Sequence, residues 1–421
     1  MKALHVMYRM SPENSGAAGL IMQALRNETN VVAIPFLHMP CGIPDEVALP
    51  NWHLAERKLS CQRLGNRLLK EFHPHRKRTL PINIDYFGLD CSGSINAQQA
   101  DIVHMHWIAD ARVSLRNLYK IRAPLVWTMH DVWPLTGGCH CNLGCEQWRD
   151  GCRECPQLGR GRASFSVSNW IWKSKKSWYS VIPAFYPVAP SHWLGDMASN
   201  SPLFAGREIH VIPNCVNTDV FRPADKRMLR RKMGIAEDAK VIAFGAVDVD
   251  SPYKGAELLV ETLQILAQRD VTPYHLLVFG GNRSQCSFGV PYPVTNLGLL
   301  ERMEDVAHAL QAADIFLGPS RQDNFPTIYL EALACGIPCV GFAIGGIPEI
   351  ARHKKTGYIA VPFDCQELAH GITWLVESQS RQAEISANAR ATAVAEYSMA
   401  ACGKKYASLY EQILREQRHH Q

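Results

Sequence analysis

The chain has 421 residues, of which 47% are hydrophobic, enough for two or three domains with sizeable cores. No apolar run approaches the roughly 20 residues of a membrane-spanning helix, and the mild net charge of +5 does not favour nucleic acid as a partner. The first residues, MKALHVMYRM, contain no signal-peptide segment, so we expect a cytoplasmic chain whose 14 cysteines are reduced, metal-bound or buried.

The N-terminal stretch has the pattern of a strand, a glycine-containing loop and a helix. An apolar strand is expected over residues 2–8, and the loop that follows it contains Gly16 and Gly19. Backbone N–H groups at the start of the next helix suit a phosphate, although this glycine spacing is not the dinucleotide fingerprint. A second strand is expected over residues 31–35.

Two stretches are basic and amphipathic. Residues 53–79 place leucines on a broad helical face decorated with Arg and Lys, and residues 170–179 interleave aromatic side chains with three lysines. A solvated helix face fits the first stretch, and so does contact with an anionic membrane surface or a lipid diphosphate. No recognised nucleic-acid module accompanies either stretch.

Polar residues follow two further apolar strands. Residues 101–107 contain His104 and His106, and residues 124–131 end with His130 and Asp131. Ligands in open α/β sheets bind at such carboxyl ends, so these histidines are candidates for a site. Hydrogen-bonded structural histidines are the alternative, above all for His104 and His106.

Five of the cysteines lie within residues 139–155. Cys152 and Cys155 form a C-x-x-C pair, Cys139 and Cys145 precede it, and Cys141 is an extra thiol. Four thiolates in a short loop suit a tetrahedral structural zinc ion, although the spacing is not that of a standard zinc module. Unligated thiols and disulfides remain open, and a reducing compartment disfavours the latter.

A second α/β domain is expected after residues 213–222. It opens with a buried strand over residues 240–246, and a loop that ends at Lys254 and Gly255 leads into a helix. Later, residues 341–350 contain the turn Gly345-Gly346 before another helix start, and the tail from residue 380 is helical and polar.

The most informative stretch is residues 313–340. It reads as a strand, a polar loop, a helix capped by Thr327 and a second strand, with Gly336 and Pro338 ending the helix. The free N–H groups and positive dipole end of this helix suit a diphosphate. Asp323 and Glu331 flank the site and are expected to face one ligand, Asp323 near a sugar and Glu331 near a ribose.

These motifs resemble the nucleotide-sugar site of the family 4 retaining glycosyltransferases. Their signature is an acidic residue, seven residues and then Glu, followed by a small-residue helix end and Gly-x-Pro. It corresponds here to Asp323, Glu331, Ala334, Gly336 and Pro338. The string from Asp323 to Pro326 is similar to that of the branch that builds bacterial exopolysaccharide, O-antigen or colanic-acid-type polysaccharide.

The resemblance implies the GT-B fold, an α/β architecture in which two Rossmann-like domains face a central cleft and helices flank parallel sheets. The N-terminal, acceptor-side domain would span residues 1–212 with its cysteine-rich loop at 136–156. The nucleotide-sugar-binding domain would span residues 213–395. A helix over residues 396–421 would cross back to the first domain.

The resemblance also implies roles for individual residues. His130, Asp323 and Glu331 would form the catalytic centre: His130 by the donor sugar, Asp323 on a sugar hydroxyl and Glu331 on the ribose. The complete set of donor contacts would be Gly16, Gly19, Lys254, Asn324, Phe325, Pro326, Thr327, Glu331, Gly345 and Gly346. Many members carry an Arg six positions before the Lys, but this chain has Asp248 there. One cationic contact to the diphosphate is therefore missing or supplied from elsewhere.

The implied activity is transfer of a sugar, with retention, from a nucleotide diphosphate sugar to a growing bacterial surface polysaccharide. No cofactor is expected in catalysis, and zinc is expected only as a structural ion. The expected acceptor is a glycan or a polyprenyl-diphosphate-linked oligosaccharide, reached at the inner face of the plasma membrane. A GT-B nucleotide-sugar epimerase and a non-catalytic sugar-nucleotide or metal-binding scaffold are the alternatives, and product analysis separates the three.

Overall fold

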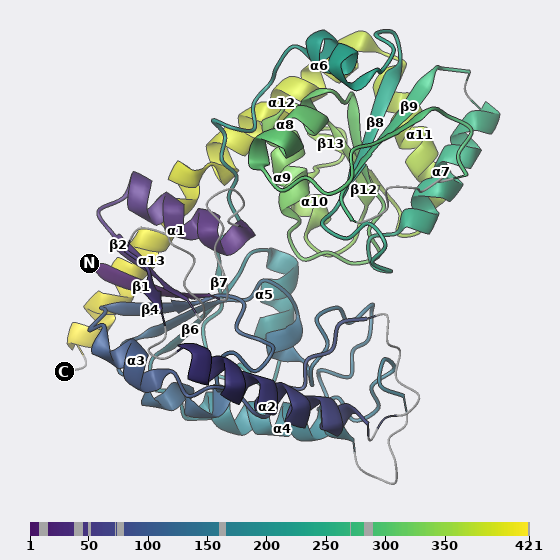
Figure 1. Ribbon diagram of the computed structural model, residues 1–421. Helices are drawn as coiled ribbons and strands as arrows, with labels where there is room; N and C mark the ends of the chain where they lie inside the picture. Colours follow the sequence, from purple (N-terminus) through teal and green to yellow (C-terminus); the bar gives the residue numbers. More distant parts are fainter. Residues whose placement is uncertain are drawn as a thin grey trace. The chain divides into compact units, whose positions relative to one another are not determined.

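The protein divides into two compact units (Figure 1). The computed structural model describes residues 1–7, 16–37, 45–48, 52–71, 73, 80–159, 166–269, 271–281 and 289–419. Met1–Pro213 and Cys402–Gln421 form the first unit, and Asn214–Ala401 forms the second. The chain thus passes into the second unit within the Ile212-Pro213-Asn214 string.

Among the described residues, the first unit contains a seven-stranded sheet with the order β3-β2-β1-β4-β5-β6-β7, and its strand pairs are parallel. The strands are β1 (Lys2–Met7), β2 (Val32–Leu37), β3 (Val47–Ala48), β4 (Ile102–Met105), β5 (Leu125–Thr128), β6 (Phe185–Ala189) and β7 (His210–Val211). The helices are α1 (Gly16–Glu28), α2 (Trp52–Lys70), α3 (Ser92–Ala97), α4 (Val167–Ser180), α5 (His192–Ser199) and α13 (Met399–His419), with short 3-10 helices η1 (Leu115–Lys120) and η2 (Trp133–Leu135). Strands β4 and β5 are buried throughout, as expected of parallel strands covered on both faces.

The described part of the second unit contains a six-stranded parallel sheet with the order β10-β9-β8-β11-β12-β13. The strands are β8 (Lys240–Gly245), β9 (Tyr274–Phe279), β10 (Val294–Asn296), β11 (Ile315–Gly318), β12 (Cys339–Phe342) and β13 (Gly357–Ala360). The helices are α6 (Lys226–Met233), α7 (Ala256–Arg269), α8 (Met303–Gln311), α9 (Thr327–Ala334), α10 (Ile347–Ile350), α11 (Cys365–Val376) and α12 (Gln379–Tyr397).

Helices cover both faces of the second sheet (Figure 1). Successive residues of β8 show why: Val241 and Ala243 pack into a core with α8 and α9, while Ile242 and Phe244 pack into another core with α7 and α11. Alternate side chains of a strand point to opposite faces, so a continuous apolar run is stable only when both faces are covered. The α/β fold predicted from the sequence is confirmed in both units.

The strand order of each sheet reverses once, and these reversals position the site. In the first unit the order reverses between β1 and β4, and in the second between β8 and β11. Open α/β sheets bind ligands at the carboxyl ends of strands next to such a switch point. The loop after β8 carries Lys254, the loop after β11 carries Asp323, and the segments after β4 and β5 carry His106 and His130.

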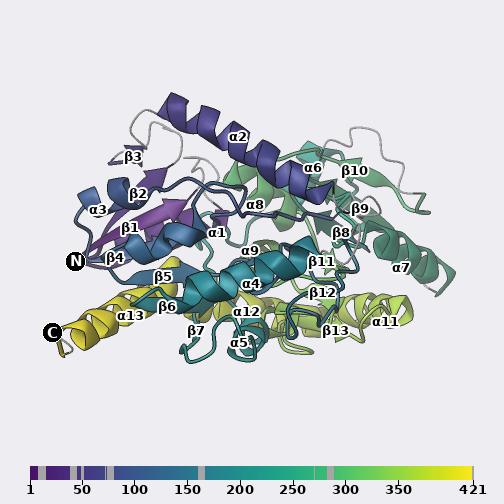
Figure 2. The ribbon, with the colours of Figure 1, turned by 90° about the horizontal axis from the view of Figure 1, so that it is seen from below.

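The C-terminal helix α13 is anchored on the first sheet (Figure 2). The buried Tyr410 hydroxyl hydrogen-bonds His104 Nδ1 at 2.6 Å, and the buried Tyr406 hydroxyl lies 2.8 Å from Thr128 Oγ1. Thr128 Oγ1 also lies 2.7 Å from His104 Nε2, so both ring nitrogens of His104 have partners. His104 is therefore a structural histidine that ties β4 and β5 to α13.

Two local predictions differ from the structure. Pro326 is the N-cap of α9 and Thr327 is its first helical residue, without a side-chain cap, because Pro326 already has the extended backbone of a cap position. The basic helix predicted over residues 53–79 ends at Lys70, and its basic cluster at residues 75–78 lies outside the described residues.

We predict that Tyr410→Phe lowers the free energy of unfolding of the first unit by about 1–3 kcal/mol, because it leaves His104 Nδ1 buried without its partner. Urea unfolding followed by tryptophan fluorescence measures this change. Tyr119→Phe is the control, because Tyr119 is 49% exposed and its substitution should change stability by less than about 0.5 kcal/mol. Equal midpoints for the two variants would contradict the anchoring role of Tyr410.

Candidate functional site

The β8–α7 loop and the β11–α9 loop of the second unit contact each other through their backbones at the switch point. Gly255, at the end of the β8–α7 loop, has φ +72°, and a Cβ atom there would lie 2.0 Å from the Pro319 carbonyl oxygen. The backbone N–H of Arg321 donates to the Tyr253 carbonyl at 2.8 Å. Only glycine fits this approach without strain, and the contact fixes the β8–α7 loop against the β11–α9 loop.

The close approach brings Lys254 to Asp323. Lys254 Nζ donates to Asp323 Oδ2 at 2.7 Å, and both side chains are largely but not fully buried. The sequence motifs predicted separate roles for these residues, a diphosphate contact and a sugar contact, and did not indicate that the two groups pair. An anionic diphosphate near this pair would compete with Asp323 for the Lys254 ammonium group.

The N-terminus of α9 supplies the second element of the site. Asn324, Phe325 and Pro326 are buried before it, and Asn214 Nδ2 donates to the Phe325 carbonyl at 3.0 Å. Pro326 has no N–H, so it contributes no donor to a diphosphate. The N–H groups of Thr327 and Ile328 have no carbonyl partner within the helix because they belong to its first turn.

Glu331 lies one turn further along α9, on the same face as Thr327. Both residues are partly exposed, whereas Tyr329, Leu330 and Ala332 are buried against the sheet. Desolvation of the Glu331 carboxyl group raises its pKa to about 7. The helix therefore presents one titratable carboxyl group beside its free N–H groups.

The turn Gly345-Gly346 supports Asp323 through its backbone. Gly345 has φ +57°, and a Cβ atom there would lie 1.8 Å from the Asp323 carbonyl oxygen. The N–H of Gly346 donates to the same oxygen at 3.3 Å. The β12–α10 loop thus fixes the backbone of Asp323, whereas Lys254 binds its carboxylate.

In the first unit, His130 is the end of a histidine chain. His130 Nε2 lies 3.1 Å from His106 Nδ1, and His106 Nε2 lies 3.0 Å from His5 Nδ1. Burial lowers the pKa of His130 to about 4 and that of His5 to about 3, so both rings are neutral at pH 7. His130 is partly exposed at the end of the chain, while His5 and His106 are buried.

Sequence reasoning missed His5. It lies in β1 directly opposite His104 in β4, with their ring centroids 4.9 Å apart. The only signal was a polar residue in the middle of an otherwise apolar strand. Its partners depend on the register of β1 against β4, which no local pattern reveals.

The remaining candidates lie as follows. Gly16 is the first residue of α1 with φ +55°, and Gly19 is buried inside that helix. The loop residues just before Gly16 lie outside the described residues. Asp248 is close to Ser251 in the β8–α7 loop, where its Oδ2 accepts from the Ser251 hydroxyl at 2.8 Å.

Histidine and cysteine side chains supply two possible ligand sets. Among the described residues, His5, His104 and His106 place one nitrogen each within 4.8 Å of one another. Both nitrogens of His104 are engaged by Tyr410 and Thr128, so these rings form a hydrogen-bonded network and not a metal site. The four candidate cysteines surround a separate small cavity.

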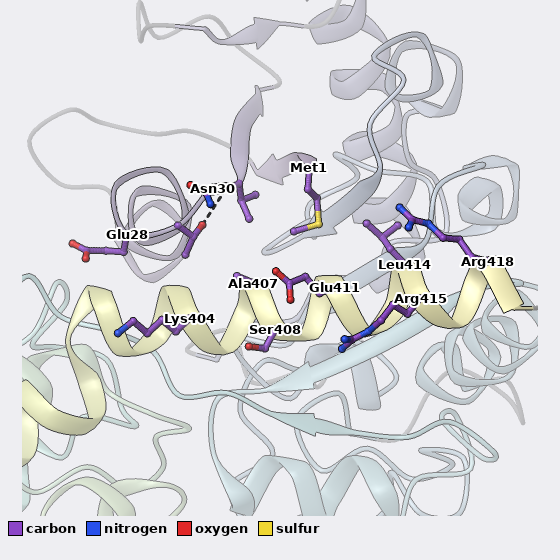
Figure 3. A pocket seen from close by; sticks show the side chains of 12 residues that line it. Met1, Glu28, Asn30, Lys404, Ala407, Ser408, Glu411, Leu414, Arg415 and Arg418 are labelled. Atoms are coloured by element: carbon purple, nitrogen blue, oxygen red, sulfur yellow. Dashed lines mark hydrogen bonds between the residues drawn. The ribbon is translucent and has the colours of Figure 1, made fainter.

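A large surface pocket of the first unit lies elsewhere. It has a volume of about 730 Å³ and lies between α13 and the start of the sheet (Figure 3). Met1, Glu28, Lys404, Glu411 and Arg415 are among its lining residues. Met1 precedes β1, so this pocket is at the amino end of the strands, whereas His130 follows a carboxyl end. It is not part of the candidate site.

The comparisons with known proteins agree with the fold. Residues 225–392 match the family model described as glycosyl transferases group 1, and residues 58–220 match that of glycosyltransferase family 4. Both units therefore match glycosyltransferase domains, and the resemblance to family 4 is supported over most of the chain.

Curated relatives are similar over part of the chain. An N-acetyl-alpha-D-glucosaminyl L-malate synthase of Bacillus anthracis is 26% identical over 50% of this chain and 55% of its own length. A GDP-mannose-dependent monoacylated alpha-(1-6)-phosphatidylinositol monomannoside mannosyltransferase of Corynebacterium glutamicum is 31% identical over 48% of this chain and 55% of its own length. The chain thus spans about half the length of the curated relatives that it matches.

Solved structures show the fold over nearly the whole chain. Anabaena Alr3699/HepE, solved in complex with UDP-glucose, is 19% identical with a TM-score of 0.62 and covers 98% of this chain and 100% of its own. WaaG, a glycosyltransferase involved in lipopolysaccharide biosynthesis, is 15% identical with a TM-score of 0.62 and covers 97% of this chain and 99% of its own. The predicted GT-B fold class is confirmed.

We predict that Gly345→Ala lowers the free energy of unfolding of the second unit by more than Gly234→Ala does. Both glycines have positive φ. A Cβ atom at Gly345 would clash with the Asp323 carbonyl oxygen, whereas a Cβ atom at Gly234 would have no atom within 4 Å. Backbone strain of about 1 kcal/mol or more is common to both, and the clash adds to it only at Gly345. Chemical denaturation measures the difference, and equal losses would show that Gly345 does not support Asp323.

Proposed function

We propose that this protein is a retaining glycosyltransferase that moves a sugar from a nucleotide diphosphate sugar to a growing bacterial surface polysaccharide. The observation that carries the proposal is the grouping at the switch point of the second sheet. There Lys254, Asp323, Glu331 and the free N–H groups of α9 lie on adjoining elements. Together they offer a cation and helix donors for a diphosphate and carboxylates for sugar hydroxyls.

Each residue then has one role in donor binding. Glu331 accepts hydrogen bonds from the ribose hydroxyls, and Asp323 accepts one from a sugar hydroxyl and orients the anomeric carbon. Lys254 and the N–H groups of Thr327 and Ile328 stabilise the leaving diphosphate, where negative charge grows in the transition state. Lys254 is held by Asp323 in the structure, so it would exchange part of that ion pair for the diphosphate.

In the transfer step, the bond between the anomeric carbon and the diphosphate oxygen breaks, and its electron pair stays on that oxygen. The acceptor hydroxyl attacks from the same face and gives its proton to the departing diphosphate. No metal or other cofactor takes part. His130 is neutral at pH 7, so we assign it to orienting the sugar by hydrogen bonding. The resemblance to family 4, which implies a place for His130 by the donor sugar, supports this role.

The polysaccharide acceptor rests on the similarity of the Asp323–Pro326 string to that branch of the family. We place the protein in the cytoplasm, peripheral at the inner face of the plasma membrane, with a polyprenyl-diphosphate-linked oligosaccharide as acceptor. Among the described residues, no helix is both long and apolar enough to cross a bilayer. The surface of α2 supports membrane contact, because Leu64 and Leu68 are 56% and 58% exposed beside the exposed Arg67.

The proposal is tested with purified protein and a panel of UDP-, GDP- and ADP-sugars. We expect one donor to bind and to be slowly hydrolysed, and Glu331→Ala to weaken its binding by about 10- to 150-fold, the equivalent of roughly 1.5–3 kcal/mol for hydrogen bonds to a charged group. Glu304→Ala, an exposed carboxylate at the start of α8, is the matched control and should bind normally.

Product analysis distinguishes the alternatives. Extension of a glycan acceptor supports transfer, whereas release of an isomerised sugar without an acceptor supports a nucleotide-sugar epimerase. If no nucleotide sugar binds and Glu331→Ala behaves like wild type, the second unit is a scaffold and the proposal is wrong.

We also predict that donor affinity rises between pH 6 and pH 8. The folded-state pKa of Glu331 is about 7, so its ionised, acceptor-only form increases up to about tenfold over this range. Calorimetry with the intact nucleotide sugar measures the change, because its diphosphate has no terminal phosphate that titrates there. Glu331→Gln should bind with a flat pH profile, and the same slope in both proteins would rule out Glu331 as the titrating group.

A further inference from the structure

Residues of the cysteine-rich loop line a small cavity. The cavity has a volume of about 20 Å³, and Cys139, Cys145, Cys152 and Cys155 all line it. The fifth cysteine of the loop, Cys141, is not among the lining residues. A cavity of this size holds one ion or one water molecule. Four of the five neighbouring cysteines therefore line one small cavity.

Backbone N–H groups are directed at two of these sulfurs. The N–H of Gly137 donates to Cys152 Sγ at 3.2 Å, and the N–H groups of Gln157 and Leu158 hydrogen-bond to Cys155. Donors two and three residues after a cysteine stabilise negative charge on its sulfur. The backbone is thus arranged for thiolates, although burial alone raises the pKa of these thiols.

Two buried amide side chains that line the cavity carry oxygens without hydrogen-bond partners among the described residues. Asn142 and Gln157 line it and are 8% and 4% exposed. Their amide nitrogens donate to the carbonyls of Cys145 and Cys141, but Asn142 Oδ1 and Gln157 Oε1 have no hydrogen-bond partner among the described residues. Buried polar atoms of this kind indicate an ion or water that the protein atoms do not supply.

A buried cation lies next to the loop. Lys175 is 0% exposed, and its Nζ donates to the carbonyls of Trp133 and Thr136 at 2.6 and 3.0 Å. It interacts electrostatically with Cys139 and Cys152. Four thiolates and one divalent cation carry a net charge of −2, so a neighbouring ammonium group reduces the cost of burying them.

We propose that Cys139, Cys145, Cys152 and Cys155 bind one structural Zn²⁺ ion in this cavity. Four protein ligands leave no open position, so the ion stabilises the loop and takes no part in chemistry. Zinc–sulfur bonds of about 2.3 Å require sulfurs about 3.8 Å apart. No three of these sulfurs lie within 4.8 Å of one another as a set, so binding requires the side chains to turn inward. Each coordinating thiol releases its proton to solvent.

The proposed ion would also fix the neighbourhood of His130. His140, in the same loop, places its Nδ1 2.7 Å from Asp131 Oδ2, and Asp131 immediately follows His130. The Thr136 hydroxyl donates to the Cys139 carbonyl at 2.8 Å, so the start of the loop is tied to the first ligand. A loop ordered by the ion would therefore hold Asp131 through His140, in addition to the hydrogen bonds of the histidine chain at His130.

The test begins with elemental analysis of the full-length protein purified without chelators. We expect about one zinc per chain in wild type, loss of at least tenfold in Cys139→Ser and Cys152→Ser, and full content in Cys141→Ser, the matched control from the same loop. Metal content is independent of donor binding, so Glu331→Ala should also retain its zinc. Iron at the same stoichiometry would overturn the assignment to zinc.

Metal exchange keeps the proposal testable if the serine variants fail to fold. Wild type stripped of metal and loaded with Co²⁺ should show the ligand-field and thiolate charge-transfer bands of a tetrahedral cobalt–thiolate site. Thiol titration of the denatured, unreduced protein should find all 14 cysteines free. If the cobalt bands are absent and all thiols are free, the cavity holds water and the proposal is wrong. If the titration finds two free thiols fewer than 14 for each disulfide formed, the cysteines are oxidised and the proposal is also wrong.

Discussion

The close backbone approach of three loops is the constraint on which the candidate site depends. The β8–α7 loop contacts the β11–α9 loop at Gly255 and Pro319, and the β12–α10 loop contacts it at Gly345 and Asp323. Both glycines have positive φ, and a side chain at either position would meet a carbonyl oxygen. Because the backbones are this close, the Lys254 ammonium group reaches the Asp323 carboxylate. Helix α9 begins four residues after Asp323, at Thr327.

The first unit uses a different device to position its residues. Neutral His5 in β1 and neutral His106, just after β4, connect through their ring nitrogens to His130. Two tyrosines of α13 hold the neighbouring His104 and Thr128. Burial favours the neutral rings, and neutral rings both donate and accept, so a chain of them is satisfied without any charge. The C-terminal helix therefore contributes to the same sheet that carries His130, although it lies about 280 residues away in the chain.

Local features of the site were predictable from the sequence, whereas contacts between distant segments were not. The strand–loop–helix pattern around Asp323 and Glu331 was predictable because hydrophobic periodicity, proline and glycine act locally. The cap was misplaced by one residue, since Thr327 and Pro326 both satisfy the local pattern and only the backbone angles distinguish them. The pairing of Lys254 with Asp323 and the role of His5 were not predictable, because each depends on a contact between segments far apart in sequence.

The sequence by itself determined the fold class, the approximate passage between the two domains, and the positions of the acidic residues, the lysine and the cysteines along the chain. These follow from local patterns of burial and turn formation and from motif spacing. The tertiary structure decided which of those groups meet: four of five loop cysteines at one cavity, Lys254 at Asp323, and His130 at the end of a buried chain. Such contacts are set by strand register and by the packing of loops against one another, and neither is encoded in any single segment.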